Sequence, residues 1–112
     1  MLFDGVPMIY QGQEQHLNGG GTPLNREAIW LTGYKTDSVL YKLTAKLNAI
    51  RKHAIKLDAG YVDVHTRSVF TGGSEMAFSK GAEGRQVIMV LSNQGIQGKA
   101  YTLQLPVTYT TG

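Results

Sequence analysis

The pattern of hydrophobic and polar positions changes twice along the chain, and each change predicts a different element. Residues 6–10 form a short apolar run between two glycines, which predicts a strand buried on both faces, as in parallel sheets. Asp37 and Ser38 then predict a helix N-cap. The apolar residues after this cap recur at helical spacing and share one face: Val39, Leu40, Leu43, Leu47, Ile50 and Ala54. We therefore expect an amphipathic helix that begins at residue 39.

From residue 60 onward apolar and polar residues alternate, and glycine-rich turns separate short stretches. This pattern predicts strands at residues 62–65, 75–79, 86–91 and 101–105, and it is typical of an antiparallel sheet or of part of a β-sandwich. Residues 11–36, which precede the predicted helix, are polar and contain three consecutive glycines. We expect them to form one long loop, and loops of this length are often functional.

The predicted elements of the first half do not complete a layer by themselves. A buried strand needs neighbours on both edges, and an amphipathic helix needs an apolar surface beneath it. The later strands have an antiparallel pattern and do not supply parallel neighbours. We therefore expect the first half to be one piece of a larger structure. The isolated chain should aggregate or be partly ordered, because burial would not offset a chain entropy of roughly 1–2 kcal/mol per ordered residue.

Composition narrows these possibilities. The chain has 112 residues, of which 42% are hydrophobic, and no cysteine. A disordered chain, a disulfide framework and a thiolate zinc site are thereby excluded, as is a complete (β/α)8 barrel of about 250 residues. No apolar run approaches the roughly 18 residues of a membrane helix, and the first residues lack the features of a signal peptide. The net charge of +3 is too small to indicate binding to nucleic acid.

Several motifs resemble those of a known enzyme family. Residues 5–14, with the sequence GVPMIYQGQE, resemble the segment around the last barrel strand of the alpha-amylases of glycoside hydrolase family 13. The following Gln15 and His16, and the NREAIW motif at residues 25–30, are similar to those of the fungal secreted members. The resemblance covers essentially the whole chain. It implies an α+β fragment in which residues 1–59 are the last βα unit of the catalytic (β/α)8 TIM barrel. Residues 60–112 would then be the N-terminal part of the antiparallel β C-terminal domain.

The resemblance also implies what the chain does and what it lacks. Alpha-amylases are retaining hydrolases of internal α-1,4-glucosidic bonds in starch, and such enzymes need two carboxyl groups about 5–5.5 Å apart. In the family these groups, and the ligands of the calcium ion, lie upstream of this segment. We therefore assign no catalytic residue, no metal ligand and no cofactor to the chain. Calcium is implied for the parent enzyme only, and the isolated chain should be inactive.

Two loop residues are candidates for substrate binding. In the resembling enzymes the arginine at the position of Arg26 contacts the sugar chain, and a guanidinium offers five donors to sugar oxygens. The alternative is an ion pair with Glu14 or Glu27 that shapes the loop. Thr22 aligns with a position that is often Asp in the subgroup and shares this role, but a threonine lacks the charged acceptor. A catalytic role for Glu14 or Glu27 is disfavoured, because carboxylates after the last barrel strand more often accept hydrogen bonds.

The remaining candidates are aromatic residues and histidines. Trp30 and Tyr34 could stack on a sugar ring, although packing of the helix is the favoured interpretation. His16, His53 and His65 show no paired spacing, so we expect each to be a surface or packing residue.

Two other functions stay open beside the amylase hypothesis. The chain could be a stand-alone carbohydrate-binding or interaction module without catalysis, and binding of starch that is lost on Arg26→Ala would support this. It could also come from a transglycosylating relative such as a glucanotransferase. In each case a starch or maltooligosaccharide partner is expected, and no nucleic acid or membrane. For the amylase parent the resemblance implies a secreted, monomeric protein, although this chain shows no signal peptide.

Overall fold

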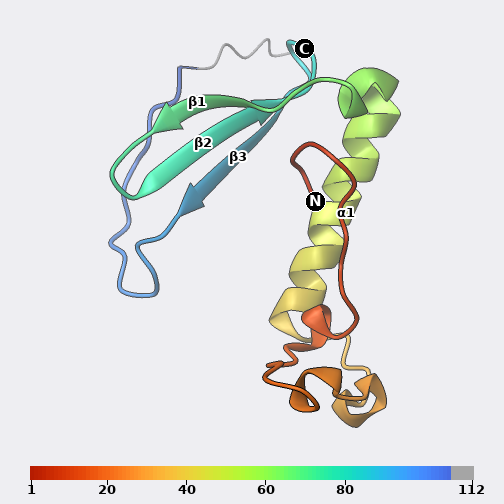
Figure 1. Cartoon of the computed structure of the whole chain (residues 1–112). Coiled ribbons are helices and arrows are strands. Elements are labelled where there is room, and N and C mark those ends of the chain that lie inside the picture. Colours follow the sequence, from red (N-terminus) through yellow and green to blue (C-terminus); the bar gives the residue numbers. More distant parts are fainter. Residues whose placement is uncertain (107–112) are drawn as a thin grey trace. The chain divides into compact units, whose positions relative to one another are not determined.

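The computed structural model describes residues 1–106 (Figure 1). Residues 5–50 form one compact unit, and residues 2–4 belong with residues 51–106 to a second unit. Residues 1–106 contain four 3-10 helices, one α-helix and three strands. In chain order these are η1 Gln13–Gln15, η2 Leu24–Arg26, η3 Ile29–Thr32, α1 Val39–Leu57, η4 Ala59–Val62, β1 Arg67–Thr71, β2 Glu75–Lys80 and β3 Val87–Ser92.

The predicted amphipathic helix is confirmed as α1. Ser38 is its N-cap, because its hydroxyl oxygen accepts a hydrogen bond of 3.2 Å from the backbone N–H of Tyr41. The apolar face of the helix is only partly covered. Ala54 is buried, whereas Leu43 and Ile50 are exposed. The signals that predict α1 are thus its apolar period and its N-cap, rather than an extensive buried face.

The strand predicted at residues 6–10 is not formed. These residues have neither helix nor strand hydrogen bonding, and Met8 is 90% exposed. The prediction fails because a strand exists only through hydrogen bonds to a neighbouring strand. The strands that the described residues form all begin after residue 66 and pair with one another.

The loop predicted at residues 11–36 has more local structure than expected, because η1, η2 and η3 lie within it. Gly12 starts η1 with a φ of +86°, a conformation that glycine adopts without strain. A Cβ at this position would lie 2.2 Å from the Cδ1 atom of Leu17. Only glycine therefore lets the chain turn back here, and this turn allows the Leu17 N–H to donate to the Gly12 carbonyl at 3.1 Å.

The strands form an antiparallel sheet in the order β1-β2-β3 (Figure 1). The strands predicted at residues 75–79 and 86–91 are confirmed as β2 and β3 within one residue at each end. β1 was not predicted, because a register shift between Ser68 and Phe70 interrupts its alternation.

Two other strand predictions are wrong. The alternation at residues 62–65 follows η4, which begins where the Asp58 side chain accepts a hydrogen bond of 2.9 Å from the Gly60 N–H. This cap sets a helical turn in place of a strand. Residues 101–105 have the alternation of a strand but no strand hydrogen bonds in the described structure.

The core of the second unit lies against the sheet. Tyr61, Ala77 and Met89 are buried, and the ring of Phe3 packs edge-on against Phe78 with centroids 5.0 Å apart. The N-terminal residues 2–4 are therefore part of this core although they are distant in sequence.

Candidate functional site

Thr22 and Arg26 lie on the same loop of the first unit, with Thr22 just before η2 and Arg26 at its end. Arg26 is the last residue of η2, and its backbone N–H donates to the Pro23 carbonyl at 2.9 Å. Both residues are exposed. Within residues 1–106 the Arg26 side chain has no ion pair or hydrogen bond, so the ion pair with Glu14 or Glu27 is not formed. The guanidinium donors are thus available to a ligand.

Two adjoining hollows lie beside η2. One has a volume of about 90 Å³ and the other about 470 Å³, and Gly19, Leu24 and Glu27 line both. Side chains of Gln11, Gln13 and Asn25 add polar groups to the smaller hollow. An apolar wall with a few amide and carboxylate groups suits a ligand rich in hydroxyl groups.

The η1 turn attaches this loop to the start of α1 by three hydrogen bonds. The Ser38 hydroxyl donates to the Glu14 carbonyl at 2.5 Å, and the Gln15 amide donates to the Lys35 carbonyl at 3.0 Å. The Leu40 N–H donates to His16 Nε2 at 3.2 Å. We call residues 13–16 and these three bonds the η1 clasp. It closes the segment between residues 17 and 34, which contains Thr22 and Arg26.

The other candidates of the sequence are dispersed. Trp30 and Tyr34 are mostly exposed on and after η3, so their rings are accessible. His53 is an exposed residue of α1, and His65 contacts Asp4 in the second unit. Residues 1–106 contain no group of three or more His, Asp or Glu side chains that could hold a metal ion. In the same range no helix is long and apolar enough to span a membrane.

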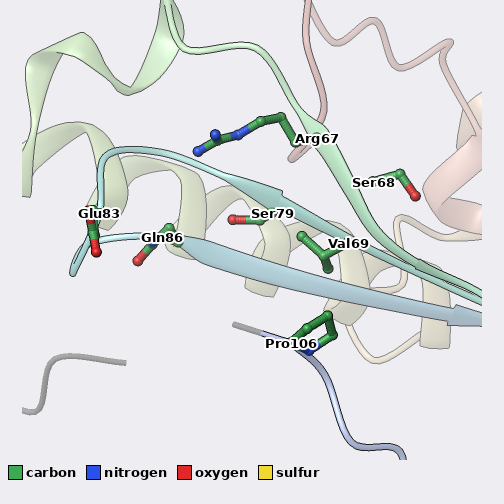
Figure 2. Close-up of a pocket in the computed structure, with 7 residues that line it drawn as sticks. All are labelled: Arg67, Ser68, Val69, Ser79, Glu83, Gln86 and Pro106. Carbon is green, nitrogen blue, oxygen red and sulfur yellow. The ribbon is translucent and has the colours of Figure 1, made fainter. Parts of the chain in front are cut away.

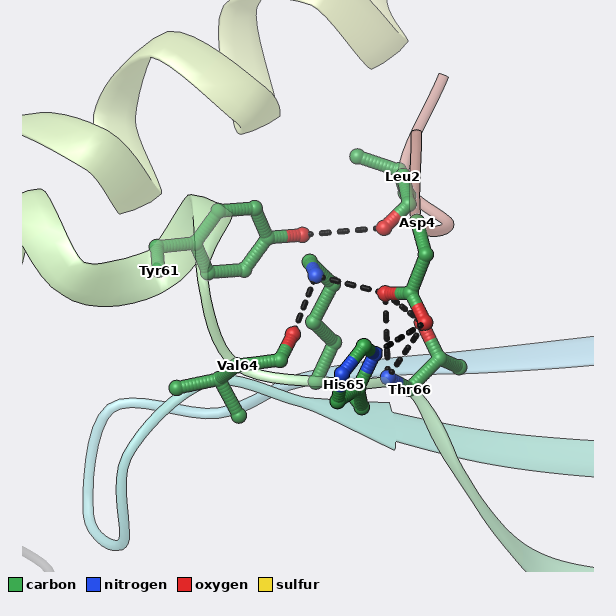
Figure 3. A network of polar contacts seen from close by, with 7 residues as sticks. Leu2, Asp4, Tyr61, Val64, His65 and Thr66 are labelled. Atoms are coloured by element: carbon green, nitrogen blue, oxygen red, sulfur yellow. Dashed lines mark hydrogen bonds and ion pairs between the residues drawn. The ribbon is translucent and has the colours of Figure 1, made fainter. Parts of the chain in front are cut away.

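A dense polar network surrounds Asp4 in the second unit (Figure 3). The Lys80 ammonium, only 1% exposed, donates to Asp4 Oδ1 at 2.6 Å and to the Val64 carbonyl. The Thr66 backbone N–H and hydroxyl donate to the same carboxylate at 3.0 and 2.8 Å. His65 Nδ1 lies 3.4 Å from Asp4 Oδ2. The hydrogen bond from Lys80, followed by those from Thr66, holds the pKa of Asp4 well below its usual range.

Tyr61 completes this network. Its hydroxyl donates to the Leu2 carbonyl at 3.1 Å, and its ring centroid lies 5.3 Å from the Lys80 ammonium. Burial raises the pKa of the Tyr61 hydroxyl, and the nearby charge of Arg51 opposes this shift. Because its polar groups are satisfied within the protein, the network is suited to holding residues 2–4 rather than to chemistry.

A separate polar hollow, of about 460 Å³, lies beside the sheet of the second unit (Figure 2). Ser79 is nearly buried there, and Arg67 is its partner in the register of β1 and β2. Sequence reasoning missed this hollow, because it missed the strand that carries Arg67. Its lining is polar apart from one valine and one proline: Arg67, Ser68, Val69, Ser79, Glu83, Gln86 and Pro106.

The comparisons with known proteins agree on one enzyme class. Residues 68–112 match the family model for domain C of alpha-amylase. The whole chain is 44% identical to alpha-amylase 1 of Schwanniomyces occidentalis and 38% identical to an alpha-amylase of Saccharomycopsis fibuligera. Among solved structures, an alpha-amylase from Malbranchea cinnamomea matches 82% of the chain with a TM-score of 0.75 and 44% identity. The predicted resemblance to fungal alpha-amylases is therefore confirmed.

The matched proteins are much longer than this chain. The chain spans 22% of the length of each of these two relatives and 19% of the solved structure. The comparisons thus relate the chain to one segment of an alpha-amylase, in which residues 68–112 match domain C.

Proposed function

We propose that this chain is a segment of a secreted alpha-amylase that hydrolyses internal α-1,4-glucosidic bonds of starch. Residues 1–59 would contribute the last βα unit of the catalytic barrel, and residues 60–112 the start of the C-terminal β domain. The observation that carries the proposal is similarity along all 112 residues to fungal alpha-amylases, at 44% identity to one of them.

The exposed apolar residues of the first unit support the barrel assignment. Val6 and Met8 are almost fully exposed, and the apolar side chains of Leu43 and Ile50 on α1 are about half exposed. An α/β barrel would supply a parallel strand on each side of residues 6–10 and a sheet under the helix. The exposed surfaces are thus those that the remainder of such a barrel would cover.

Within this enzyme the segment would bind substrate rather than break bonds. Arg26 would donate hydrogen bonds to sugar hydroxyl groups from the end of η2, and Thr22 would add a neutral hydroxyl. The reaction needs a nucleophilic carboxylate and a carboxylic acid, and we place both outside this chain. A calcium ion, which the resemblance implies for the parent enzyme, would also be held outside this chain.

The proposal is tested with the complete polypeptide that contains this segment and with the 112-residue chain alone. We expect the complete polypeptide to release reducing sugars from soluble starch, with the anomeric configuration of the substrate retained. The chain alone should release none. Turnover by the repurified chain would contradict the proposal. Saturable binding of maltooligosaccharides to a complete polypeptide that never hydrolyses them would favour a binding module.

A further inference from the structure

We propose that His16 is a positioning residue for substrate binding, because it closes the η1 clasp and thereby fixes the loop that carries Thr22 and Arg26. This inference rests on the proposed function, since it assigns a role in binding glucan. His16 would not touch the sugar itself, because its side chain accepts a hydrogen bond from the Leu40 N–H at the start of α1.

The η1 turn concentrates loop-closing contacts in four consecutive residues. Gln13 Oε1 accepts a hydrogen bond from the Tyr10 N–H at 2.8 Å, which fixes the start of the turn. Glu14, Gln15 and His16 then make the three bonds of the clasp, to residues 20 to 24 positions away. One short turn therefore joins both ends of a long loop.

His16 supplies the contact of the clasp that depends most on side-chain chemistry. The first N–H groups of an α-helix have no partner within the helix. His16 Nε2 accepts one of them, that of Leu40, while the Ser38 hydroxyl accepts that of Tyr41. An accepting Nε2 requires an unprotonated nitrogen, so the ring hydrogen is on Nδ1. Lysine or alanine at this position could not make this bond.

The backbone of His16 is consistent with a residue held in place by its surroundings. Its φ of 60° and ψ of 33° lie in the left-handed region, which only a few per cent of residues other than glycine adopt, with asparagine, aspartate and histidine the most frequent among them. Such a conformation persists where neighbouring contacts favour it. Here the His16 N–H donates to the Gln13 carbonyl at 3.2 Å and the side chain reaches α1.

Opening the clasp would release the segment between residues 17 and 34 at both ends. Arg26 would then sample more positions, and the ordering entropy would oppose glucan binding. The reacting carboxyl groups lie outside this segment under the proposed function. The loss should therefore appear in the KM for maltooligosaccharides and leave kcat nearly unchanged.

The test uses the complete polypeptide with His16→Ala, His16→Gln, Arg26→Ala and the double variant His16→Ala/Arg26→Ala. His53→Ala is the matched control, because His53 is an exposed histidine of α1 without a described contact. We expect His16→Ala to raise the KM about fivefold, which corresponds to the loss of one hydrogen bond. His16→Gln, which keeps an acceptor, should restore most of the affinity. In the double variant, His16→Ala should raise the KM little beyond the increase that Arg26→Ala causes alone.

Hydrogen–deuterium exchange of peptides from residues 17–34 gives a second readout, which does not depend on turnover. We expect faster exchange there in His16→Ala than in His53→Ala, with no change in peptides from the sheet. If His16→Ala and His53→Ala had equal KM values and equal exchange rates, the proposed role of the η1 clasp would be wrong. A kcat loss without a KM change, or full additivity with Arg26→Ala, would also contradict it. A wild-type polypeptide without amylase activity would overturn the proposed function instead, while the exchange comparison would still decide whether His16 holds the loop.

Discussion

The Lys80 ammonium and the Asp4 carboxylate lie 2.6 Å apart, although 76 positions separate them in the sequence. Their environments differ, because the Lys80 side chain is buried and the Asp4 side chain is 42% exposed. Loss of either partner should therefore have unequal consequences.

Asp4→Ala should destabilise the second unit more than Lys80→Met does. The first change leaves a buried ammonium without its counter-charge, whereas the second leaves a carboxylate that water and Thr66 still solvate. Hydrogen exchange of peptides from β1 and β2 in the complete polypeptide measures the difference. Equal protection in the two variants would contradict this ranking.

Acid should weaken the same network. The folded-state pKa of Asp4 lies below its ordinary value of 3.8, so its stabilising contribution is complete above that value and is lost as the pH falls below it. Asp4→Asn should therefore lower the melting temperature at neutral pH, and the gap to wild type should narrow below about pH 4. A gap that stayed constant down to pH 3 would show that Asp4 does not act through its charge.

Ser38→Ala should destabilise α1 by about 1 kcal/mol, the usual cost of losing an N-cap. The Ser38 hydroxyl both accepts from Tyr41 and donates to Glu14, so the clasp should loosen as well. Ser38→Thr keeps the hydroxyl and is the control. The free energy of unfolding is measured with denaturant, and hydrogen exchange of peptides from α1 reports on the helix itself. Equal stability of the Ala and Thr variants would contradict the proposed role of the Ser38 hydroxyl.

Gly81→Ala should cost about 1–3 kcal/mol, because residue 81 has a φ of +110° and an added Cβ would lie 3.1 Å from the Arg85 carbonyl oxygen. Gly73→Ala is the matched control, since a Cβ there would meet no atom within 4 Å. The control should remain close to wild type in thermal unfolding. Equal melting temperatures for the two variants would refute the expected strain.

Thr22→Asp should tighten the binding of maltooligosaccharides if Thr22 contacts sugar as proposed. A carboxylate forms stronger, charge-assisted hydrogen bonds with hydroxyl groups than a threonine does. We expect a KM several-fold lower in the complete polypeptide, with Thr22→Ser unchanged as the control. An unchanged KM in Thr22→Asp would show that residue 22 does not contact the sugar.

Local signals predicted the elements that depend on local interactions. α1 follows from its apolar period and from Ser38, and β2 and β3 follow from alternation between glycine turns. β1 escaped prediction because the register shift after Ser68 breaks the alternation. At residues 62–65 the alternation was present, but the side chain of Asp58 favours a helical turn just before it.

Local sequence patterns do not predict contacts between residues that are far apart in the sequence. Nothing around Asp4 indicates a partner at Lys80, and nothing around His16 indicates a bond to the start of α1. The resemblance placed Arg26 and Thr22 on one loop, and the structure has them there, exposed, with Thr22 just before η2 and Arg26 at its end. Their contact with sugar stays a prediction.

The inclusion of residues 2–4 in the second unit affects how this segment can be exchanged between related enzymes. A hybrid that received only residues 51 onward from a donor would combine the recipient's Leu2, Phe3 and Asp4 with a foreign tyrosine, phenylalanine and lysine. The hydrogen bonds to Tyr61 and Lys80 and the ring contact with Phe78 would then form only if the residues of the two enzymes happened to match. Successful grafts should carry both stretches together, with three crossover points instead of one.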